Sequence, residues 1–167
     1  MRGTSRLRAS ITLRHARPED AALLRRLFDE DRRSGLARSG LDGPGFDAIL
    51  DLQHDAHRAL CAQWYPGAVD QVIEADAVGA GRILVHETSE GLCVADLAVA
   101  EAFRGQGLAT RALGHWTARA DASGLPVTVK AAWDHPAVRL FKRLGFDHVS
   151  TEGGGQLLRR PPGTTIS

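Results

Sequence analysis

The stretch Asp96–Thr110 reads DLAVAEAFRGQGLAT and joins an apolar run to a turn with two glycines and then to a helical pattern. Gly105 and Gly107 let the backbone come close to a ligand, because glycine has no side chain. The first amides of the following helix have no partner within that helix and face outward at the positive end of its dipole. The stretch predicts a turn that binds a phosphate or pyrophosphate; the alternative is a tight turn without a ligand.

Two common phosphate-binding loops do not fit this stretch. The chain contains no G-x-x-x-x-G-K-S/T pattern, which excludes a Walker A loop. A dinucleotide fold needs a third glycine where this chain has Thr110, and an acidic residue at the end of the next strand, where it has Lys130. The expected ligand is therefore a different kind of phosphate compound.

A second motif, DHPAVRLFKRLGF, follows at residues 134–146. The segment Arg104–Ala109, RGQGLA, resembles the Q/R-x-x-G-x-G/A signature of the GNAT superfamily of acyl-CoA-dependent N-acetyltransferases. Residues 134–146 resemble that family's second signature, N-x-x-A-x-x-L-Y-x-x-x-G-F. The two motifs stand in the usual order and at the usual separation. The resemblance covers about residues 11–160 and is strongest over 92–146.

Hydrophobic periodicity predicts strands and helices that mix along the chain. Strands are expected over 11–14, 71–75, 81–86, 92–99, 126–131, 146–150 and 156–159, with helices from Pro18 and over 46–64, 107–124 and 136–145, and a glycine-rich loop over 35–45. The predicted class is α/β (α+β), with a single mixed, mostly antiparallel central sheet flanked by helices. The resemblance implies that this sheet is splayed at the cofactor site.

Length and composition indicate one domain with short ends. We expect a flexible tail over 1–9, a single N-acetyltransferase domain over 10–160 and a loose C-terminal tail over 161–167. Apolar residues make up 43% of the 167 residues, which excludes a chain disordered throughout. No apolar run approaches the ~20 residues of a membrane span, and none follows the basic N-terminus as in a secretory signal.

Charge and cysteine content indicate which partners and which cellular location to expect for the protein. The formal net charge of +1 gives no bulk attraction to nucleic acid or to an acidic membrane, so neither is an expected partner. Cys61 and Cys93 lie far apart without metal-ligand spacing, which is typical of reduced thiols in a cytoplasm. The expected location is cytoplasmic. Dimers are common in the family resembled, so a homodimer is a possible assembly.

The resemblance implies that acetyl-CoA is the cosubstrate. In the family, the glycine turn holds the pyrophosphate, and the preceding strand pairs with the pantetheine arm like an added strand. The backbone amide near Leu97 would also face the thioester oxygen and stabilise the oxyanion. Carried over to this chain, the implied cofactor-binding residues are Leu97, Ala98, Val99, Arg104, Gly105, Gln106, Gly107, Leu108, Ala109, Thr110, Asp134 and Phe141.

Two positions depart from the family pattern. Phe141 stands where the family has a tyrosine proposed to protonate the leaving thiolate, and phenylalanine has no proton to give. That proton would come from water, from the amine or from another side chain. A thiol with a pKa near ~8.5 is a fair leaving group, so the change should slow the reaction rather than abolish it. Asp134 replaces an asparagine, which keeps an acceptor and removes an amide donor.

The general base is not at the positions where family members carry it. Those positions match Cys93 and Ala95, and neither residue is suited to the role. A hairpin loop of four residues would pair His86 with residue 93, and a loop of two would pair it with 95. Either register places His86 on the same sheet face as Cys93 and Ala95. A histidine there has a suitable pKa for a base. The alternative is an ordinary exposed histidine; Glu74 is the next candidate, while Asp96 and Glu101 are expected to be structural.

The acceptor pocket is expected on the early helices. Gln53 and His57 interrupt the apolar stripe of the 46–64 helix, so they either line a pocket or bond to backbone at the helix edge. Trp64 and Tyr65 lie where the family's early helices wall this pocket. His54 and His57 have no third ligand at a suitable spacing, so we expect no metal.

Two functions of different classes remain open from the sequence, and a third possibility is transfer of an acyl group longer than acetyl. The first is an enzyme that moves acetyl from acetyl-CoA to a primary amine, of a small molecule or a peptide, by direct attack in a ternary complex. The second is a non-catalytic acyl-CoA-binding module that acts as a sensor or scaffold, since the usual tyrosine and bases are missing.

Overall fold

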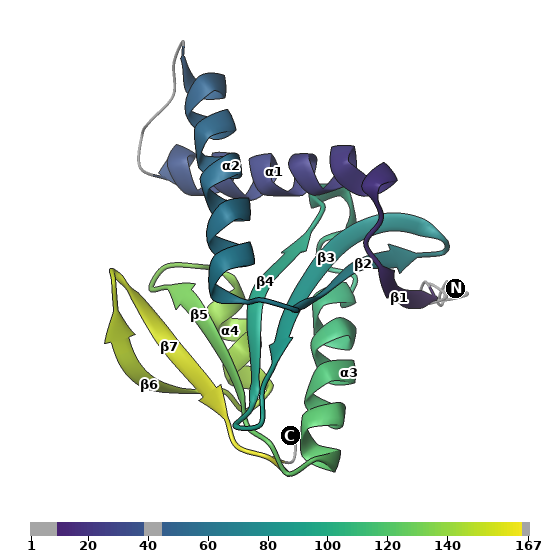
Figure 1. The fold of residues 1–167 in the computed structure, drawn as a ribbon, viewed down its shortest axis with the longest axis vertical. Helices are drawn as coiled ribbons and strands as arrows, with labels where there is room; N and C mark the ends of the chain where they lie inside the picture. Colours follow the sequence, from purple (N-terminus) through teal and green to yellow (C-terminus); the bar gives the residue numbers. More distant parts are fainter. Residues whose placement is uncertain (1–9, 39–44, 165–167) are drawn as a thin grey trace, which may run out of the picture.

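The computed structural model describes residues 10–38 and 45–164 (Figure 1). The strands are β1 (Ile11–His15), β2 (Val69–Ala75), β3 (Val78–Glu87), β4 (Leu92–Val99), β5 (Val127–Ala132), β6 (Asp147–Glu152) and β7 (Gly155–Arg160). The α-helices of these residues are α1 (Ala21–Arg38), α2 (Phe46–Trp64), α3 (Leu108–Ala122) and α4 (Ala137–Arg143), and two short 3-10 turns are η1 (Pro18–Asp20) and η2 (Glu101–Phe103).

The strands form one seven-stranded sheet in the order β1-β2-β3-β4-β5-β7-β6. All neighbouring strands are antiparallel except β4 and β5, which are parallel and joined through α3. The prediction of a mixed, mostly antiparallel sheet with flanking helices is confirmed. Each parallel pair needs a crossover connection, and α3 supplies it here.

The helices lie on opposite faces of the sheet. One sheet face packs against α3 and α4 in the main core, which includes Ile73, Ile83, Val85, Val94, Leu113, Trp116, Phe141, Phe146 and Leu158. On the other face, α1 and α2 cross each other over the middle strands (Figure 1). Leu27 of α1 and Leu50 of α2 are buried there.

The sheet opens between β4 and β5. Their pairing covers only Leu92, Cys93 and Val94 of β4, although β4 continues to Val99. A bulge lies at the same place, because Val85 pairs with Val94 while its neighbour Leu84 pairs with Asp96. An extra residue in one strand bends that strand and increases its twist. The two strands diverge in Figure 1 from this point, as the resemblance implied.

Another bulge lies on an edge strand of the sheet. In β6, His148 pairs with Leu158 and Ser150 pairs with Leu157, so Val149 is the extra residue. The other edge strand, β1, is five residues long.

The observed elements differ from the predicted ones mainly at their ends. The predicted loop over 35–45 is wrong at its start, because α1 continues through Gly35 to Arg38. A single glycine costs a helix about 1 kcal/mol, which the surrounding favourable residues can offset. β2 and β3 begin earlier than predicted, at Val69 and Val78.

The predicted tails are only partly within the described residues. Residues 1–9 and 165–167 lie outside them. Residues 161–164 contact the domain: the Gly163 amide donates to Asp121 (2.7 Å), and the Arg160 guanidinium donates to the Thr164 carbonyl oxygen (2.7 Å). Arg160 also makes two hydrogen bonds to Asp121. None of the helices in residues 10–38 and 45–164 has the length and apolar character needed to cross a membrane.

An ion-pair cluster ties β1 to the start of α1. The Arg14 guanidinium makes two hydrogen bonds to Asp20, at 2.7 and 2.8 Å, and a third to Glu74 of β2. These bonds from Arg14, with one from the Arg17 amide, lower the pKa of Asp20 to about 2. Ionised Asp20 therefore stabilises the fold above its ordinary pKa, and this contribution is lost as pH falls through about 2.

We predict that Asp20→Asn lowers the melting temperature by several degrees at neutral pH, because it removes the carboxylate that Arg14 binds. The difference from wild type should shrink as pH falls from about 4 toward about 2, where wild-type Asp20 also becomes neutral. Circular-dichroism melts across this range measure it. The exposed neighbour Glu19 provides the control Glu19→Gln, and a difference that stays constant down to pH 2 would contradict the assignment.

Candidate functional site

The glycine turn presents open backbone at the start of α3. Gly105 and Gly107 have φ angles of 75° and 78°, in the left-handed region that favours glycine. A β-carbon built on either residue would meet no heavy atom within 4 Å, so the space beside the turn is open. Leu108 is buried and anchors the helix start, while the Arg104 guanidinium donates to the Val99 carbonyl oxygen at 3.0 Å. This arrangement fits a pyrophosphate held by the turn and the first amides of α3.

The strand before the turn has a free edge that fits the rest of the cofactor. Leu97, Ala98 and Val99 pair with Ile83, Arg82 and Gly81 of β3 on one side. On the other side, β5 pairs with β4 only as far as Val94. An extended ligand can pair with such an edge as an added strand would. The gap therefore suits a pantetheine arm.

Two other predicted cofactor residues lie near the end of β5. Asp134 is exposed in the turn between β5 and α4. Phe141 is only 3% exposed, and its ring centroid lies 5.7 Å from that of Phe146 in the core. The Phe141 side chain is thus a packing residue and has no polar group to offer a leaving thiolate.

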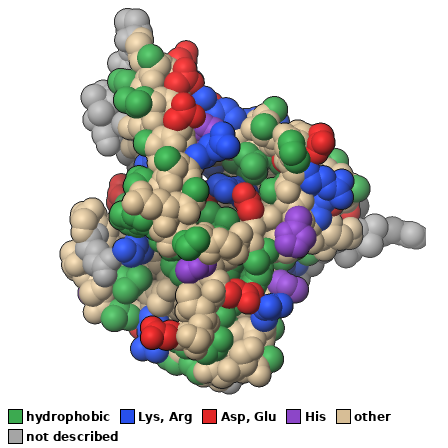
Figure 2. Space-filling view, viewed as in Figure 1, with side chains coloured by type: hydrophobic (Ala, Val, Ile, Leu, Met, Phe, Trp, Pro, Cys, Tyr) green, Lys and Arg blue, Asp and Glu red, His purple; other side chains and the backbone are tan. Residues whose placement is uncertain are grey.

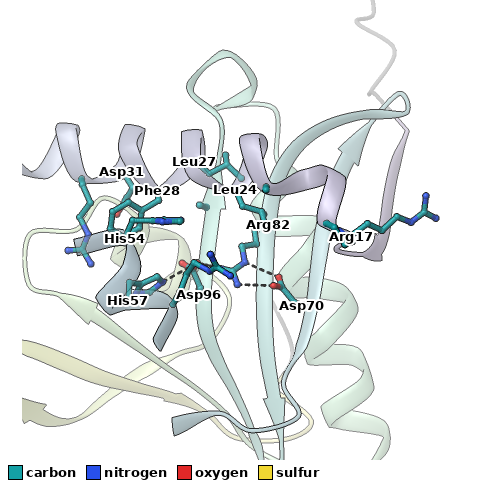
Figure 3. Close-up of a pocket in the computed structure, with 15 residues that line it drawn as sticks. Arg17, Leu24, Leu27, Phe28, Asp31, His54, His57, Asp70, Arg82 and Asp96 are labelled. Atoms are coloured by element: carbon teal, nitrogen blue, oxygen red, sulfur yellow. Dashed lines mark hydrogen bonds and ion pairs between the residues drawn. The ribbon is translucent and has the colours of Figure 1, made fainter. Parts of the chain in front are cut away.

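A cavity of about 260 Å³ lies beneath α1 and α2, on the opposite sheet face from α3 (Figure 3). Figure 2 shows the hollow with basic and acidic side chains around it. Its floor is formed by Asp70, Arg82, Asp96 and Ala98 of the sheet. Its walls are Arg17, Pro18, Ala21, Leu24, Leu27, Phe28, Asp31 and Arg32 near α1, and His54, His57 and Arg58 of α2.

A charged cluster spans three strands at the cavity floor. The Arg82 guanidinium makes two hydrogen bonds of 2.8 Å to Asp70 and one of 2.8 Å to Asp96 (Figure 3). Burial alone would lower the pKa of Arg82, but the hydrogen bonds to Asp70 and the charge of Asp96 hold that pKa above its usual range. Two carboxylates thus share one guanidinium, which leaves the floor with surplus negative charge.

His57 extends from α2 to this floor. Its Nε2 atom lies 3.6 Å from Oδ2 of Asp96 and 3.7 Å from Sγ of Cys61. Because both contacts use the same ring nitrogen, the imidazole cannot relay a proton between Cys61 and Asp96 through its two nitrogens. Burial, and secondarily the charge of Asp96, raise the pKa of the Cys61 thiol, so it is a neutral thiol rather than a nucleophile.

The structure separates the four predicted acceptor residues. His57 lines the cavity, whereas Gln53, Trp64 and Tyr65 are not among its lining residues. Gln53 Oε1 is buried without a hydrogen-bond partner among the described residues, and Trp64 is 60% exposed. The rings of Tyr65 and His86 meet edge to face, with centroids 5.7 Å apart.

His86 lies opposite Cys93 in the β3–β4 pair, as predicted for a four-residue loop. The two residues therefore share the sheet face that α1 and α2 cover. His86 is not among the residues that line the cavity, however. Three histidines thus lie on this side of the sheet, and His54 and His57, but not His86, line the cavity.

Sequence reasoning missed most of the cavity floor. Arg82 and Asp96 each interrupt an otherwise apolar strand, and that interruption was the available signal for a polar site. Asp96 was expected to be structural, yet it faces the cavity beside His57. Phe28 was expected only as part of an apolar stripe, and it packs against both His54 and His57. Among the described residues, no group of three metal-ligating side chains is placed to hold a metal ion.

Solved structures share this fold. The PaiA N-acetyltransferase of Thermoplasma acidophilum, in complex with coenzyme A, matches with a TM-score of 0.71 and 12% identity over 91% of this chain and 99% of that one. An acetyltransferase of Thermus thermophilus matches with a TM-score of 0.66 and 23% identity, over 92% and 98% of the two chains. The ribosomal-protein-S18-alanine N-acetyltransferase of Escherichia coli gives 0.65 and 11%, over 93% and 96%. At such low sequence identities, the likeness to these structures shows a shared fold alone.

No curated protein gives a significant sequence match to the chain. The family model described as "Acetyltransferase (GNAT) family" matches residues 24–146, which hold the glycine turn, the cavity floor and the second motif. The open sheet, the glycine turn and this match lead to one conclusion: the chain belongs to the acetyltransferase (GNAT) family.

Proposed function

We propose that the protein transfers acetyl from acetyl-CoA to a primary amine bound in the cavity beneath α1 and α2, by direct attack in a ternary complex. The observation that carries this proposal is the position of Asp96 and Ala98. They form part of the cavity floor and flank Leu97, on the stretch of β4 that has left β5. Donor and acceptor would thus meet across one strand.

Acetyl-CoA would bind along β4 and the glycine turn. The pyrophosphate would accept hydrogen bonds from the amides between Gly105 and Thr110, and the pantetheine arm would pair with the free edge of Leu97–Val99. The Leu97 amide would donate to the thioester oxygen as negative charge develops on it. Asp134 and Phe141 would border the arm from the other side of the gap.

The cavity suits an ammonium group attached to an apolar body. The floor around Asp96 carries surplus negative charge, while Leu24, Leu27 and Phe28 offer an apolar wall. An alkyl amine is mostly protonated at neutral pH, so this floor would attract it. Arg17, Arg32 and Arg58 at the walls outnumber Asp31 there and oppose several positive charges at once, which favours an acceptor with one ammonium group.

The amine must lose a proton before its nitrogen can attack the thioester carbon. We assign this proton to His57 rather than to His86, because His57 lines the cavity and its Nε2 atom lies 3.6 Å from the Asp96 carboxylate. His54 also lines the cavity, but burial lowers its pKa, which makes it a weaker base. The carbon–nitrogen bond then forms, the tetrahedral intermediate collapses, and the carbon–sulfur bond breaks. With Phe141 in place of a tyrosine, the departing thiolate takes its proton from water or from the new amide nitrogen.

The proposed location and partners of the protein rest on its net charge and its two free thiols. Cys61 and Cys93 are both free cysteines, which suits a reducing cytoplasm. The net charge of +1 provides no general attraction to nucleic acid or membranes. The proposed acceptor is accordingly a small molecule or a peptide amine.

The central test is thiol release from acetyl-CoA in the presence of amines, amino acids, aminoglycosides and short peptides. We expect one class of acceptor to accelerate release, with acetyl-CoA binding followed separately by thermal shift. Binding without acceleration by any acceptor would favour a non-catalytic acyl-CoA-binding sensor or scaffold. No binding at all would contradict the assignment of the glycine turn.

Gly107→Asp tests the donor site. Its carboxylate would occupy the space of the pyrophosphate, so acetyl-CoA affinity should fall by at least about a hundredfold. Gly107→Asn is the matched control, because asparagine has the same size and tolerates the left-handed conformation equally, but carries no charge. Isothermal titration calorimetry compares them, and equal affinities for the two variants would count against the site.

The proton acceptor is tested by comparing His57→Ala with His86→Ala. At pH 7, His57→Ala should lower kcat by about a hundredfold, and at pH 9 the loss should be much smaller because more amine is already neutral. Added imidazole should restore part of the loss. His86→Ala should change kcat little at either pH. A larger effect at His86, or an equal loss at both pH values for His57→Ala, would overturn the assignment.

A further inference from the structure

The charges around the cavity beneath α1 and α2 are unevenly distributed. Its floor carries surplus negative charge, because Asp70 and Asp96 share the single guanidinium of Arg82 (Figure 3). Its walls carry surplus positive charge, because three arginines line them and Asp31 is the one carboxylate there. A molecule that fills the cavity therefore meets a negative floor and a positive wall.

Two of the wall arginines are placed to bind a ligand. The Arg17 side chain points away from the cavity in Figure 3, which leaves Arg32 of α1 and Arg58 of α2. Within residues 10–38 and 45–164, neither of these two forms an ion pair or a hydrogen bond with a carboxylate. The wall carboxylate, Asp31, lies instead 3.4 Å from Nε2 of His135. Two cations at the wall are thus available for an anionic group.

Both arginines lie close to the proposed proton acceptor. The Cζ atom of Arg32 lies 5.2 Å from the centroid of the Phe28 ring, and this centroid lies 5.5 Å from that of His57. Arg58 directly follows His57 in α2, and both residues line the cavity. A small molecule whose amine faces His57 can therefore reach these arginines with its other end.

The size and the lining of the cavity indicate the kind of molecule that fits. Its volume of about 260 Å³ lies below the ~300–1,000 Å³ of sites for drug-sized ligands. Leu24, Leu27 and Phe28 add apolar surface to the charged groups. A guanidinium presents N–H donors in a plane that matches a carboxylate. The cavity thus suits a small zwitterion with an apolar body.

We propose that the acceptor is an amino acid with an apolar side chain, whose carboxylate binds Arg32 and Arg58 while its amine faces His57. This inference rests on the proposed acetyl transfer and names the substrate class of the same cavity. The carbon–nitrogen bond forms and the carbon–sulfur bond breaks. Of the two protons that the ammonium group loses, one reaches the thiolate and the other passes through His57 to solvent. Acetylation removes the ammonium charge, so the product loses its attraction to the floor.

Thiol release with matched acceptors tests the role of the carboxylate. Leucine, leucinamide and isoamylamine share one apolar body, and phenylalanine, phenylalaninamide and phenethylamine form a second set. In at least one set, kcat/KM should be about tenfold or more higher for the free amino acid, because only it can form charged hydrogen bonds with the arginines. Acceleration by the amides or plain amines that equals or exceeds that by the amino acids in both sets would overturn the inference and leave acetyl transfer standing.

Arg32→Gln and Arg58→Gln test the two arginines. Each should lower kcat/KM for the amino acid about tenfold, and should raise it for the plain amine, since a charge that opposes the ammonium group is gone. General damage to the site would lower both values. Arg58→Lys keeps the charge without the planar donors and should restore part of the loss. Arg26→Gln removes a positive charge from α1 away from the cavity and should leave the ratio of the two values unchanged.

Isothermal titration calorimetry of the same amino acids into the CoA-saturated protein measures the site without turnover. Amino acid binding that Arg58→Gln weakens about tenfold would support the carboxylate site even without acetyl transfer, and would then contradict the proposed function alone. No binding of any amino acid would overturn the inference. A loss of acetyl-CoA affinity in Arg32→Gln or Arg58→Gln, with amino acid binding intact, would assign that arginine to the donor and would overturn it as well.

Discussion

The end of hydrogen bonding between β4 and β5 at Val94 is the feature on which the rest of the site depends. The bulge opposite Leu84 and Val85 turns the end of β4 away from β5 and leaves one strand edge without a neighbour. The same strand then leads into the glycine turn, where α3 begins. A continuously paired sheet would have no place for an extended donor. The donor site and the acceptor cavity that we propose would therefore lie along the edge and over one face of the same bent strand.

The three charged residues of the cavity floor, Asp70, Arg82 and Asp96, stabilise one another. Arg82 is largely buried, and a buried charge is costly unless other groups bond to it. Asp70 and Asp96 supply those bonds from the strands on either side of β3. Loss of either carboxylate would leave Arg82 partly unpaired, which would weaken the packing of three strands as well as the charge of the site.

Much of the fold and the glycine turn could be predicted from the sequence, because both depend on local patterns. Glycine spacing, alternating apolar residues and the second motif lie within short segments, so the strands, α3 and the glycine turn were predicted close to their observed bounds. The end of α1 was not, since Gly35 sits within a helix whose remaining residues favour that conformation. Pairing of His86 with Cys93 is one of the two registers that the sequence left open, and the structure has the one with a four-residue loop.

The acceptor cavity was harder to predict, because its residues come from segments far apart in the chain. Asp70, Arg82 and Asp96 meet only when β2, β3 and β4 are paired. Trp64 belongs to the apolar stripe by spacing, yet the helix turns it outward. Periodicity reports which residues share one side of a helix, but not which of them the sheet will cover.

The bulge in β6 bears on how the molecule avoids aggregation. An open sheet has two edge strands whose backbone groups can pair with another chain, and long flat edges invite fibril-like growth. Here β1 is short, and the bulge at Val149 interrupts the regular hydrogen-bonding pattern of β6. Asp147 adds a charge at the start of that strand. Strand-to-strand association is thereby discouraged at both edges of the sheet, so neither edge offers a template for uncontrolled β-pairing.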